Sequence, residues 1–309
     1  MRALIVTNMY PDADHPAYGS FVRDQVEALR RVAGVELELF SFAGGSLSAY
    51  PRAGVDLRRR FGGTRFDVVH AHFGLTAWPA LGARSAVRGV TLHGTDLAHP
   101  RSRAITLAAL RCYDLVAAVS EPLAQSVPGW AVRRELAVLP VGVATDRFKP
   151  IGRAQARSEL GLDPDRPLLL FAADPARPEK RYDRARLIAA EIPLLTLGNV
   201  PPEEVPLWVN AVNAVLVPSE REGFGLAVLE ALACDVPVLA TPVGIAPDVL
   251  RDVEGTYCGP FEPGAWAAAL APHLTAPDPR IAGRAQAERF STERMATHLV
   301  EAWRALLSA

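Results

Sequence analysis

The chain has 309 residues, of which half are hydrophobic and 22% charged, and its formal net charge at pH 7 is −1. This length and composition predict a globular protein of about two domains. No stretch approaches the roughly 20 apolar residues of a membrane span, and the first residues read as a strand, so we expect neither a spanning helix nor a signal peptide. Three scattered cysteines without metal-ligand spacing indicate a reducing cytoplasm.

The two halves of the chain differ in charge. Residues 1–150 hold 18 Lys and Arg against 13 Asp and Glu, whereas residues 151–309 hold 15 against 21. The basic first half, with its run Arg58-Arg59-Arg60, indicates contact with an anionic membrane face or an acidic acceptor, or else an ordinary solvated surface. Basic and aromatic residues do not interleave, so we expect no nucleic acid partner. The predicted location is the cytoplasm, with the inner face of the membrane as an option.

Short apolar runs alternate with helical or polar segments along the first half. Strands are predicted at 3–6, 35–40, 67–71, 89–92, 115–119 and 136–139, and a helix at 21–32. Polar residues gather just after strand ends, in the loop 7–20, in the stretch 70–72 and in the stretch 93–96. This pattern is typical of an α/β protein with a doubly wound parallel sheet, in which ligands bind at the carboxyl ends of the strands.

The turn-rich stretch 140–150 is the predicted domain boundary. After it the same pattern restarts, with a helix at 154–160 and strands at 168–172, 194–197, 214–217, 236–240 and 255–258. Further helices are predicted near residues 183, 203, 225, 245, 263 and 279. The last segment begins at the capping residue Ser291 and places Met295, Leu299 and Leu306 on one face, which predicts an amphipathic helix packed on a domain.

The stretch 218–230, Pro-Ser-Glu-Arg-Glu-Gly-Phe-Gly-Leu-Ala-Val-Leu-Glu, carries the strongest functional signal. An apolar strand runs into it and an apolar helix leaves it, so the free N–H groups at the helix start predict a phosphate site. Glu222 on the loop and Glu230 two turns into the helix favour hydrogen bonds to sugar or ribose hydroxyls and stabilisation of a cationic transition state. On their own, they are equally consistent with a helix-terminal charge and a solvated helix residue.

Candidate partners of this phosphate site lie in the loop 174–181. Only Lys149 and Lys180 are lysines, against 31 arginines, which favours a specific need for an ammonium group at Lys180. Arg177 and Lys180 are expected to reach the same anion as the helix start.

The histidines of the first half are weaker candidates. His93 ends a strand before Gly94, which places it at the predicted ligand edge. His70 and His72 are predicted to point to opposite faces of their strand, so that at most one faces a cleft. No histidine has metal-ligand spacing. The absence of a Walker loop, a nucleophile elbow or a GxGxxG after the first strand argues against NTPase, hydrolase and NAD-dependent dehydrogenase functions.

Together these motifs resemble the retaining, nucleotide-sugar-dependent glycosyltransferases of family 4, which have the GT-B fold. The match covers nearly the whole chain and is most specific at the two glutamates separated by seven residues, Glu222 and Glu230. Weaker matches are His93-Gly94 and the stretches 119–121, 140–148 and 178–180. The resemblance implies two Rossmann-like domains facing across a cleft, with residues 1–150 on the acceptor side, residues 151–290 binding the donor, and residues 291–309 packing back on the first domain.

The resemblance also implies roles for the matched residues. Glu222 becomes the acid near the donor sugar, Lys180 the cation that neutralises the leaving diphosphate, and His93 a contact of the sugar at the reacting centre. Glu230 becomes the ribose ligand. The implied remaining donor-binding residues are Gly19, Arg177, Gly223, Phe224, Gly225 and Leu226, and the weaker acceptor-side candidates are His72 and Asp96.

The implied reaction uses no cofactor or tightly bound metal and moves a sugar from a nucleoside diphosphate to a glycan, glycolipid or small-molecule hydroxyl. The chain departs from the family at Asp174 and Pro175, where an arginine is usual, and at Tyr18-Gly19, where a glycine pair is common. Two alternatives remain open at this point. One is a non-catalytic protein that binds sugar nucleotides or glycans, and the other is a GT-B epimerase or phosphorylase.

Overall fold

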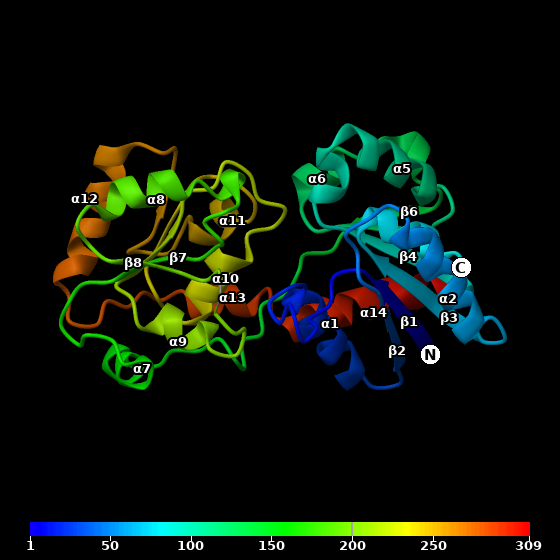
Figure 1. Cartoon of the computed structure of the whole chain (residues 1–309), viewed down its shortest axis with the longest axis horizontal. Helices are drawn as coiled ribbons and strands as arrows, with labels where there is room; N and C mark the ends of the chain where they lie inside the picture. Colours follow the sequence, from blue (N-terminus) through cyan, green and yellow to red (C-terminus); the bar gives the residue numbers. More distant parts are fainter. Residues whose placement is uncertain (199) are drawn as a thin grey trace. The chain divides into compact units, whose positions relative to one another are not determined.

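The computed structural model describes residues 1–198 and 200–309, which divide into two compact units. Unit 1 consists of Met1–Gly142 together with Thr292–Ala309, and unit 2 of Val143–Ser291. Each unit is a parallel β-sheet with helices packed on it (Figure 1). The chain therefore leaves unit 1 within the turn-rich stretch 140–150 and returns to it with its last helix.

The sheet of unit 1 has the strand order β2-β1-β3-β4-β5-β6, with every pair parallel. Its strands are β1 (Arg2–Thr7), β2 (Glu36–Ser41), β3 (Arg65–His72), β4 (Arg84–Leu92), β5 (Leu115–Ala118) and β6 (Glu135–Val138). Its helical segments are α1 (Ser20–Arg31), α2 (Ala49–Phe61), η1 (Gly74–Thr76), α3 (Ala77–Ala80), α4 (Thr95–Ala98), α5 (Pro100–Leu110), α6 (Glu121–Gln125), η2 (Gly129–Ala131) and α14 (Thr292–Ser308).

Strand β1 is apolar on both sides because both faces of its sheet are covered. Ile5 packs with the inward faces of α1 and α14, whereas Leu4 packs with α2 and α5. Successive residues of a strand point to opposite faces, which is why a continuous apolar run such as 3–6 fits a strand between two helical layers. In Figure 1, α14 (red) runs beside α1 (blue), and the two helices are in contact.

Helices α2 and α5 are not among the predicted elements. In α2, Pro51 and Gly54 interrupt the apolar spacing, although Ala53, Leu57 and Phe61 recur every four residues and are buried. In α5 apolar residues surround the axis, so no one-sided pattern marks the helix. Both helices form because tertiary packing outweighs the weak local signal.

The sheet of unit 2 has the strand order β11-β10-β9-β7-β8, again with every pair parallel. Its strands are β7 (Leu169–Phe171), β8 (Leu194–Thr196), β9 (Ala214–Val217), β10 (Val238–Ala240) and β11 (Tyr257–Cys258). Its helical segments are α7 (Arg153–Leu160), η3 (Pro178–Lys180), α8 (Tyr182–Ala189), α9 (Val205–Asn210), α10 (Leu226–Ala233), α11 (Ala246–Leu250), α12 (Pro263–Thr275) and α13 (Arg284–Glu288).

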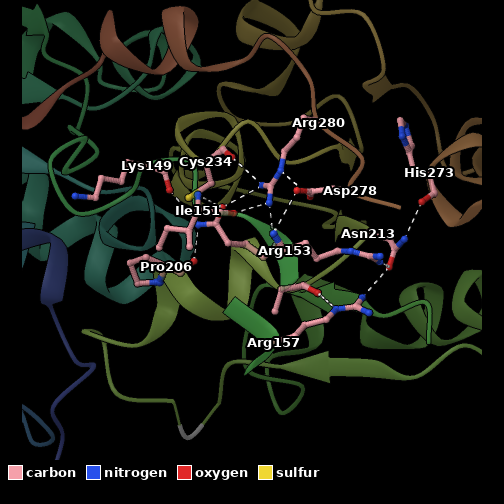
Figure 2. A network of polar contacts seen from close by, with 12 residues as sticks. Lys149, Ile151, Arg153, Arg157, Pro206, Asn213, Cys234, His273, Asp278 and Arg280 are labelled. Carbon is pink, nitrogen blue, oxygen red and sulfur yellow. Dashed lines mark hydrogen bonds and ion pairs between the residues drawn. The ribbon is translucent and has the colours of Figure 1, made fainter. Parts of the chain in front are cut away.

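A buried polar network fixes the amino ends of the central strands of unit 2 (Figure 2). Asn213, directly before β9, accepts hydrogen bonds at Oδ1 from Arg153 and Arg157 at 3.1 Å each and from the backbone N–H of Leu168, directly before β7, at 3.0 Å. Its Nδ2 donates to the carbonyl of His273 at 2.8 Å. These bonds hold β7 and β9 in register at one end of the sheet and leave their carboxyl ends for ligands.

Candidate active site

The carboxyl ends of β7 and β9 form the switch point of the unit 2 sheet. The chain passes from β7 to β8 on one side, and β9 lies on the other side of β7. Loops leaving such a pair diverge, and ligands of open α/β sheets bind between them. The loop after β7 carries Lys180 and the loop after β9 carries Glu222, so the strand order brings together two residues that are 42 positions apart.

Lys180 and Glu222 form an ion pair at this switch point. The Lys180 Nζ donates to both carboxylate oxygens, at 2.7 Å to Oε1 and 2.6 Å to Oε2. The side chains are 15% and 8% exposed, so water screens the pair less than an open surface pair. The Ser219 hydroxyl donates to Glu222 Oε1 at 2.7 Å, and the Thr241 hydroxyl donates to the Ser219 carbonyl, which fixes the carboxylate from behind.

Helix α10 begins directly beside this pair. Gly225 precedes the helix at φ 102°, a conformation that side chains rarely adopt, and turns the chain from the Glu222 loop into α10. Gly244 lies against the loop from the other side, where an added Cβ would stand 2.3 Å from the Phe224 carbonyl oxygen. The Ile245 N–H donates to that oxygen at 2.7 Å. The loop is therefore fixed by backbone contacts, and the first N–H groups of α10 follow directly after Gly225, where an added Cβ would stand 3.8 Å from Glu222 Cγ.

The other predicted donor ligands of unit 2 occupy different positions. Glu230 lies about one turn into α10 and not two turns as predicted, because the helix begins only at Leu226. Leu226 and Glu230 are on the same partly exposed side of the helix, about 6 Å apart along the axis. Phe224 is buried and packs edge-on against Phe290, so its loop presents backbone to a ligand. Arg177 is half exposed and donates from Nε and Nη2 to Glu179 Oε1 at 2.9 and 2.7 Å.

In unit 1 the switch point lies between β1 and β3, since β2 and β3 flank β1. Gly19 ends the loop after β1, at φ 72°, and is itself buried. A Cβ there would stand 2.3 Å from the Met9 carbonyl carbon and 2.7 Å from the Tyr10 nitrogen. The loop therefore needs glycine for its own packing, and an approach of Gly19 to the donor stays a prediction.

A cavity of about 450 Å³ opens beside this loop. Its lining includes Asn8 and Tyr18 from the β1 loop and Ser41, the last residue of β2. No functional role is predicted from the sequence for Asn8 or Ser41. The polar loop 7–20 was the available signal, but its pairing with the end of β2 follows only from the strand order.

The prediction that His70 and His72 point to opposite faces of β3 is wrong. Residues two apart in a strand share a face, and the ring centroids lie 5.4 Å apart. His70 is fully buried between Trp303 and Thr91. The Trp303 indole N–H, which can only donate, lies 3.1 Å from His70 Nδ1, so the neutral ring carries its proton on Nε2 and donates to the Thr91 hydroxyl at 2.7 Å.

His72 pairs with His93, the histidine at the end of β4. The His72 Nδ1 and His93 Nε2 atoms are 3.1 Å apart and the rings stack at 5.3 Å. Burial lowers both pKa values, that of His72 to about 4, so both rings are neutral near pH 7. His72 Nε2 is buried without a partner among the described atoms. A buried orphan N–H is rarer than an orphan acceptor, so we infer that His72 donates and His93 keeps its proton on Nδ1.

Asp96 links the segments that follow β3 and β4. Its carboxylate accepts from the Gly74 N–H at 2.5 Å and from the His93 N–H at 2.6 Å. Burial raises the pKa of the carboxyl group, and these backbone hydrogen bonds oppose the rise. Asp96 is fully buried and so positions the His93 backbone. A direct contact with an acceptor stays a prediction.

Similar folds occur among solved structures. Sucrose-phosphate synthase from Thermosynechococcus elongatus superposes with a TM-score of 0.74 at 18% identity and covers 100% of both chains. The Anabaena protein Alr3699/HepE in complex with UDP gives 0.71 at 16% identity, over 99% of this chain and 100% of that one. Two parallel-sheet units of this kind, each Rossmann-like, define the GT-B class of glycosyltransferases.

Sequence comparison identifies the family within the GT-B class. The family model described as Glycosyl transferases group 1 matches residues 156–293, and Glycosyltransferase Family 4 matches residues 4–147. A D-inositol 3-phosphate glycosyltransferase of Segniliparus rotundus is 30% identical over 302 residues, 79% of this chain and 67% of that protein. The same-named enzyme of Geodermatophilus obscurus is 30% identical over 78% and 66%. The chain belongs to glycosyltransferase family 4, is a glycosyltransferase, and spans about two thirds of the length of these relatives.

No helix within residues 1–198 and 200–309 is both long and apolar enough to cross a membrane.

Proposed function

We propose that the enzyme transfers a sugar from a nucleoside diphosphate to an acceptor hydroxyl, with retention of the anomeric configuration and without a tightly bound metal. The observation that carries this proposal is the Lys180–Glu222 ion pair beside the start of α10, at the switch point of the unit 2 sheet. An ammonium group and free helix N–H groups together suit a diphosphate, and the carboxylate suits a sugar hydroxyl.

In the proposed reaction the bond between the anomeric carbon and the diphosphate oxygen breaks first. Negative charge then develops on the diphosphate, where Lys180 and the N–H groups from Gly223 to Leu226 stabilise it. The acceptor oxygen bonds to the same face of the oxocarbenium-like sugar, and its proton passes to an oxygen of the leaving diphosphate. Glu222 holds Lys180 in place and stabilises the positive charge on the sugar. Glu230, one turn along α10, binds the ribose hydroxyls.

The groups of unit 1 act on the same donor in this proposal. With its proton on Nδ1, His93 offers a hydrogen bond to a sugar oxygen, and its low pKa keeps the ring neutral beside a developing cation. Asp96 sets the position of this histidine through the backbone. Gly19 and Arg177 remain secondary donor contacts.

The acceptor is proposed to bind unit 1, in the cavity of about 450 Å³ beside the β1 loop. The relatives are named for an inositol phosphate, which makes a phosphorylated polyol one acceptor to test. A lipid-linked glycan is the other, and the basic balance of residues 1–150 supports contact of this unit with the inner face of a membrane.

The first experiment measures thermal stabilisation by UDP, GDP, ADP, CMP and their sugar conjugates. A ligand that binds the folded state raises the midpoint temperature of thermal unfolding according to its occupancy. We expect one nucleoside diphosphate to stabilise the enzyme and Glu230→Ala to abolish that shift. UDP comes first because one structural neighbour was solved with it. Chelation of divalent metals is expected to leave both the shift and transfer unchanged.

The controls separate this function from its alternatives. Glu220→Gln removes an exposed carboxylate that pairs with Arg181 in the same loop region, so its shift should equal that of the wild type. No stabilisation by any member of the panel contradicts the proposal. Stabilisation without transfer to any acceptor supports a binding protein. Turnover of a UDP-sugar without acceptor supports an epimerase, and a requirement for inorganic phosphate supports a phosphorylase.

A further inference from the structure

A groove of about 700 Å³ lies on unit 1 among helices α2, α3 and α5. Its walls include Leu47, Val55, Trp78 and Ile105, whose exposed fractions are 71%, 50%, 43% and 38%. Large apolar side chains gathered in an open hollow of this size are typical of a binding site. None of the site residues discussed above belongs to it.

The aromatic residues of the groove have their polar atoms engaged by the protein. The Trp78 indole N–H donates to the carbonyl of Ile105 at 3.1 Å, and this is the only donor of the indole. The Tyr50 hydroxyl accepts from Asn8 Nδ2 at 3.2 Å. Both rings therefore offer mainly carbon to an occupant, which favours a hydrocarbon over a polar ligand.

The floor of the groove depends on a close approach of α2 to the segment after α3. A Cβ at Gly82 would stand 2.8 Å from the Gly54 carbonyl oxygen and 3.1 Å from that of Pro79. A Cβ at Gly54 would stand 3.4 Å from Pro79 Cα. The floor of the hollow is thus built by tight backbone packing.

The lining of the groove includes one cationic side chain. Arg58 is the only charged residue among the described residues that line it, and no ion-pair partner of Arg58 lies within the described part of the chain. Arg59 and Arg60 follow in the exposed last turn of α2, where Arg59 pairs with Asp56 at 3.5 Å. An apolar hollow whose lining includes an unneutralised guanidinium is complementary to a hydrocarbon chain that ends in an anion.

We propose that this groove binds the hydrocarbon chain of a phosphate-bearing amphiphile, with Arg58 contacting the phosphate. The inference rests on the proposed function for its role, because it assigns the acceptor to the lipid-linked class. Asn8 connects the two places: its side chain contacts Tyr50 of the groove wall and also lines the cavity beside the β1 loop.

The test uses decyl phosphate below its micelle concentration, with decanol and inorganic phosphate as matched probes, and measures heats of binding to the full chain without donor. Decyl phosphate is expected to bind at least about tenfold more tightly than either probe, because only it fills the groove and meets Arg58. Equal affinity for decyl phosphate and inorganic phosphate overturns the proposal.

Substitutions in the groove test where decyl phosphate binds. Val55→Asp puts a carboxylate on an exposed wall position and should weaken decyl phosphate binding at least about tenfold, and Trp78→Ala should weaken it as well. Trp130→Ala removes another exposed tryptophan of unit 1, outside the groove, and should leave it unchanged. Arg58→Ala should abolish the preference over decanol. Wild-type affinity in both Val55→Asp and Trp78→Ala overturns the assignment.

Two further outcomes identify a different occupant or separate the two proposals. A dimer in sedimentation that Val55→Asp dissociates shows that a second copy of the chain covers the groove, which overturns the amphiphile assignment. Transfer to a water-soluble polyol phosphate, measured separately, supports the proposed function even when decyl phosphate fails to bind. Failure of binding and failure of transfer are thus distinguishable.

Discussion

Lys180 and Glu222 form an ion pair, so their separate contributions appear only when each is removed. Lys180→Ala should weaken nucleoside diphosphate binding by about 10- to 100-fold, because a charge-assisted contact is lost. Glu222→Gln should keep most of that affinity but lower turnover at least about 100-fold, because the carboxylate acts on the sugar. Calorimetry and steady-state kinetics measure the two effects.

The exposed pair Arg181–Glu220 is the matched control for this prediction. Its carboxylate is 54% exposed, so Glu220→Gln should change both quantities by less than about twofold. Wild-type turnover in both Lys180→Ala and Glu222→Gln contradicts the assignment. Because the two residues share hydrogen bonds, the double variant should lose less than the product of the single losses.

Burial of the neutral His72 ring should make the stability of the fold depend on pH. Its pKa falls from an ordinary 6.5 to about 4 on folding, so the unfolded chain binds more protons between these values. The contribution of His72 to the free energy of unfolding is fully present above pH 6.5 and is lost as the pH falls toward 4. At pH 5 the loss from this residue is about 2 kcal/mol. Denaturant unfolding at pH 7.5 and pH 5 measures it, and His72→Gln should reduce the difference by about that amount. An unchanged difference in the variant would show that His72 is not buried as a neutral ring.

At the level of strands, Gly89 makes room for the histidine cluster. It pairs with His70 across β3 and β4, and a Cβ at Gly89 would stand 2.3 Å from His70 Nδ1. Gly89→Ala should therefore lower the free energy of unfolding by about 1 to 3 kcal/mol or more, because the fully buried ring has nowhere to move. Gly63→Ala, where the added Cβ meets nothing within 4 Å, should change it by less than about 0.5 kcal/mol. Equal effects of the two substitutions in urea unfolding contradict this packing.

The strands and the functional loops follow from the sequence more closely than the contacts between them. The apolar runs at β1, β7 and β9 and the Glu222 to α10 junction all lie where the local pattern predicts them. The Lys180–Glu222 contact depends on β7 lying next to β9. Local patterns in a single sequence do not predict this strand order. The contact of Ser219 with Glu222, three residues later, depends on the conformation of their own loop, which no periodic pattern predicts.

The histidine error has a different origin. His70 and His72 were assigned opposite faces, although the two-residue period of a strand puts them on one. The Trp303 partner of His70 is 233 residues away, so no local pattern announces it. The sequence does not predict helix α2, because Pro51 and Gly54 interrupt its four-residue apolar spacing. The apolar groove, which α2 lines, is therefore not predicted either.

For the whole molecule, the two units should unfold separately. Trp303 in unit 1 and Trp266 in unit 2 are both fully buried, so truncation of either to Ala should cost about 3 to 5 kcal/mol. In scanning calorimetry Trp303→Ala should lower one transition and Trp266→Ala the other. A single transition that both substitutions shift equally would show that the units unfold together.

The return of α14 to unit 1 has a consequence for biosynthesis. The face of the sheet that holds Ala3 and Ile5 needs α14 for its cover, but the ribosome must first make the 149 residues of unit 2. At about 5 to 20 residues per second this takes roughly 7 to 30 s, during which the nascent first unit presents an apolar face. Unit 2, which is continuous in sequence, can fold in that interval. Unit 1 is therefore started before unit 2 and completed after it, so unit 1 is the one that a chaperone has reason to hold.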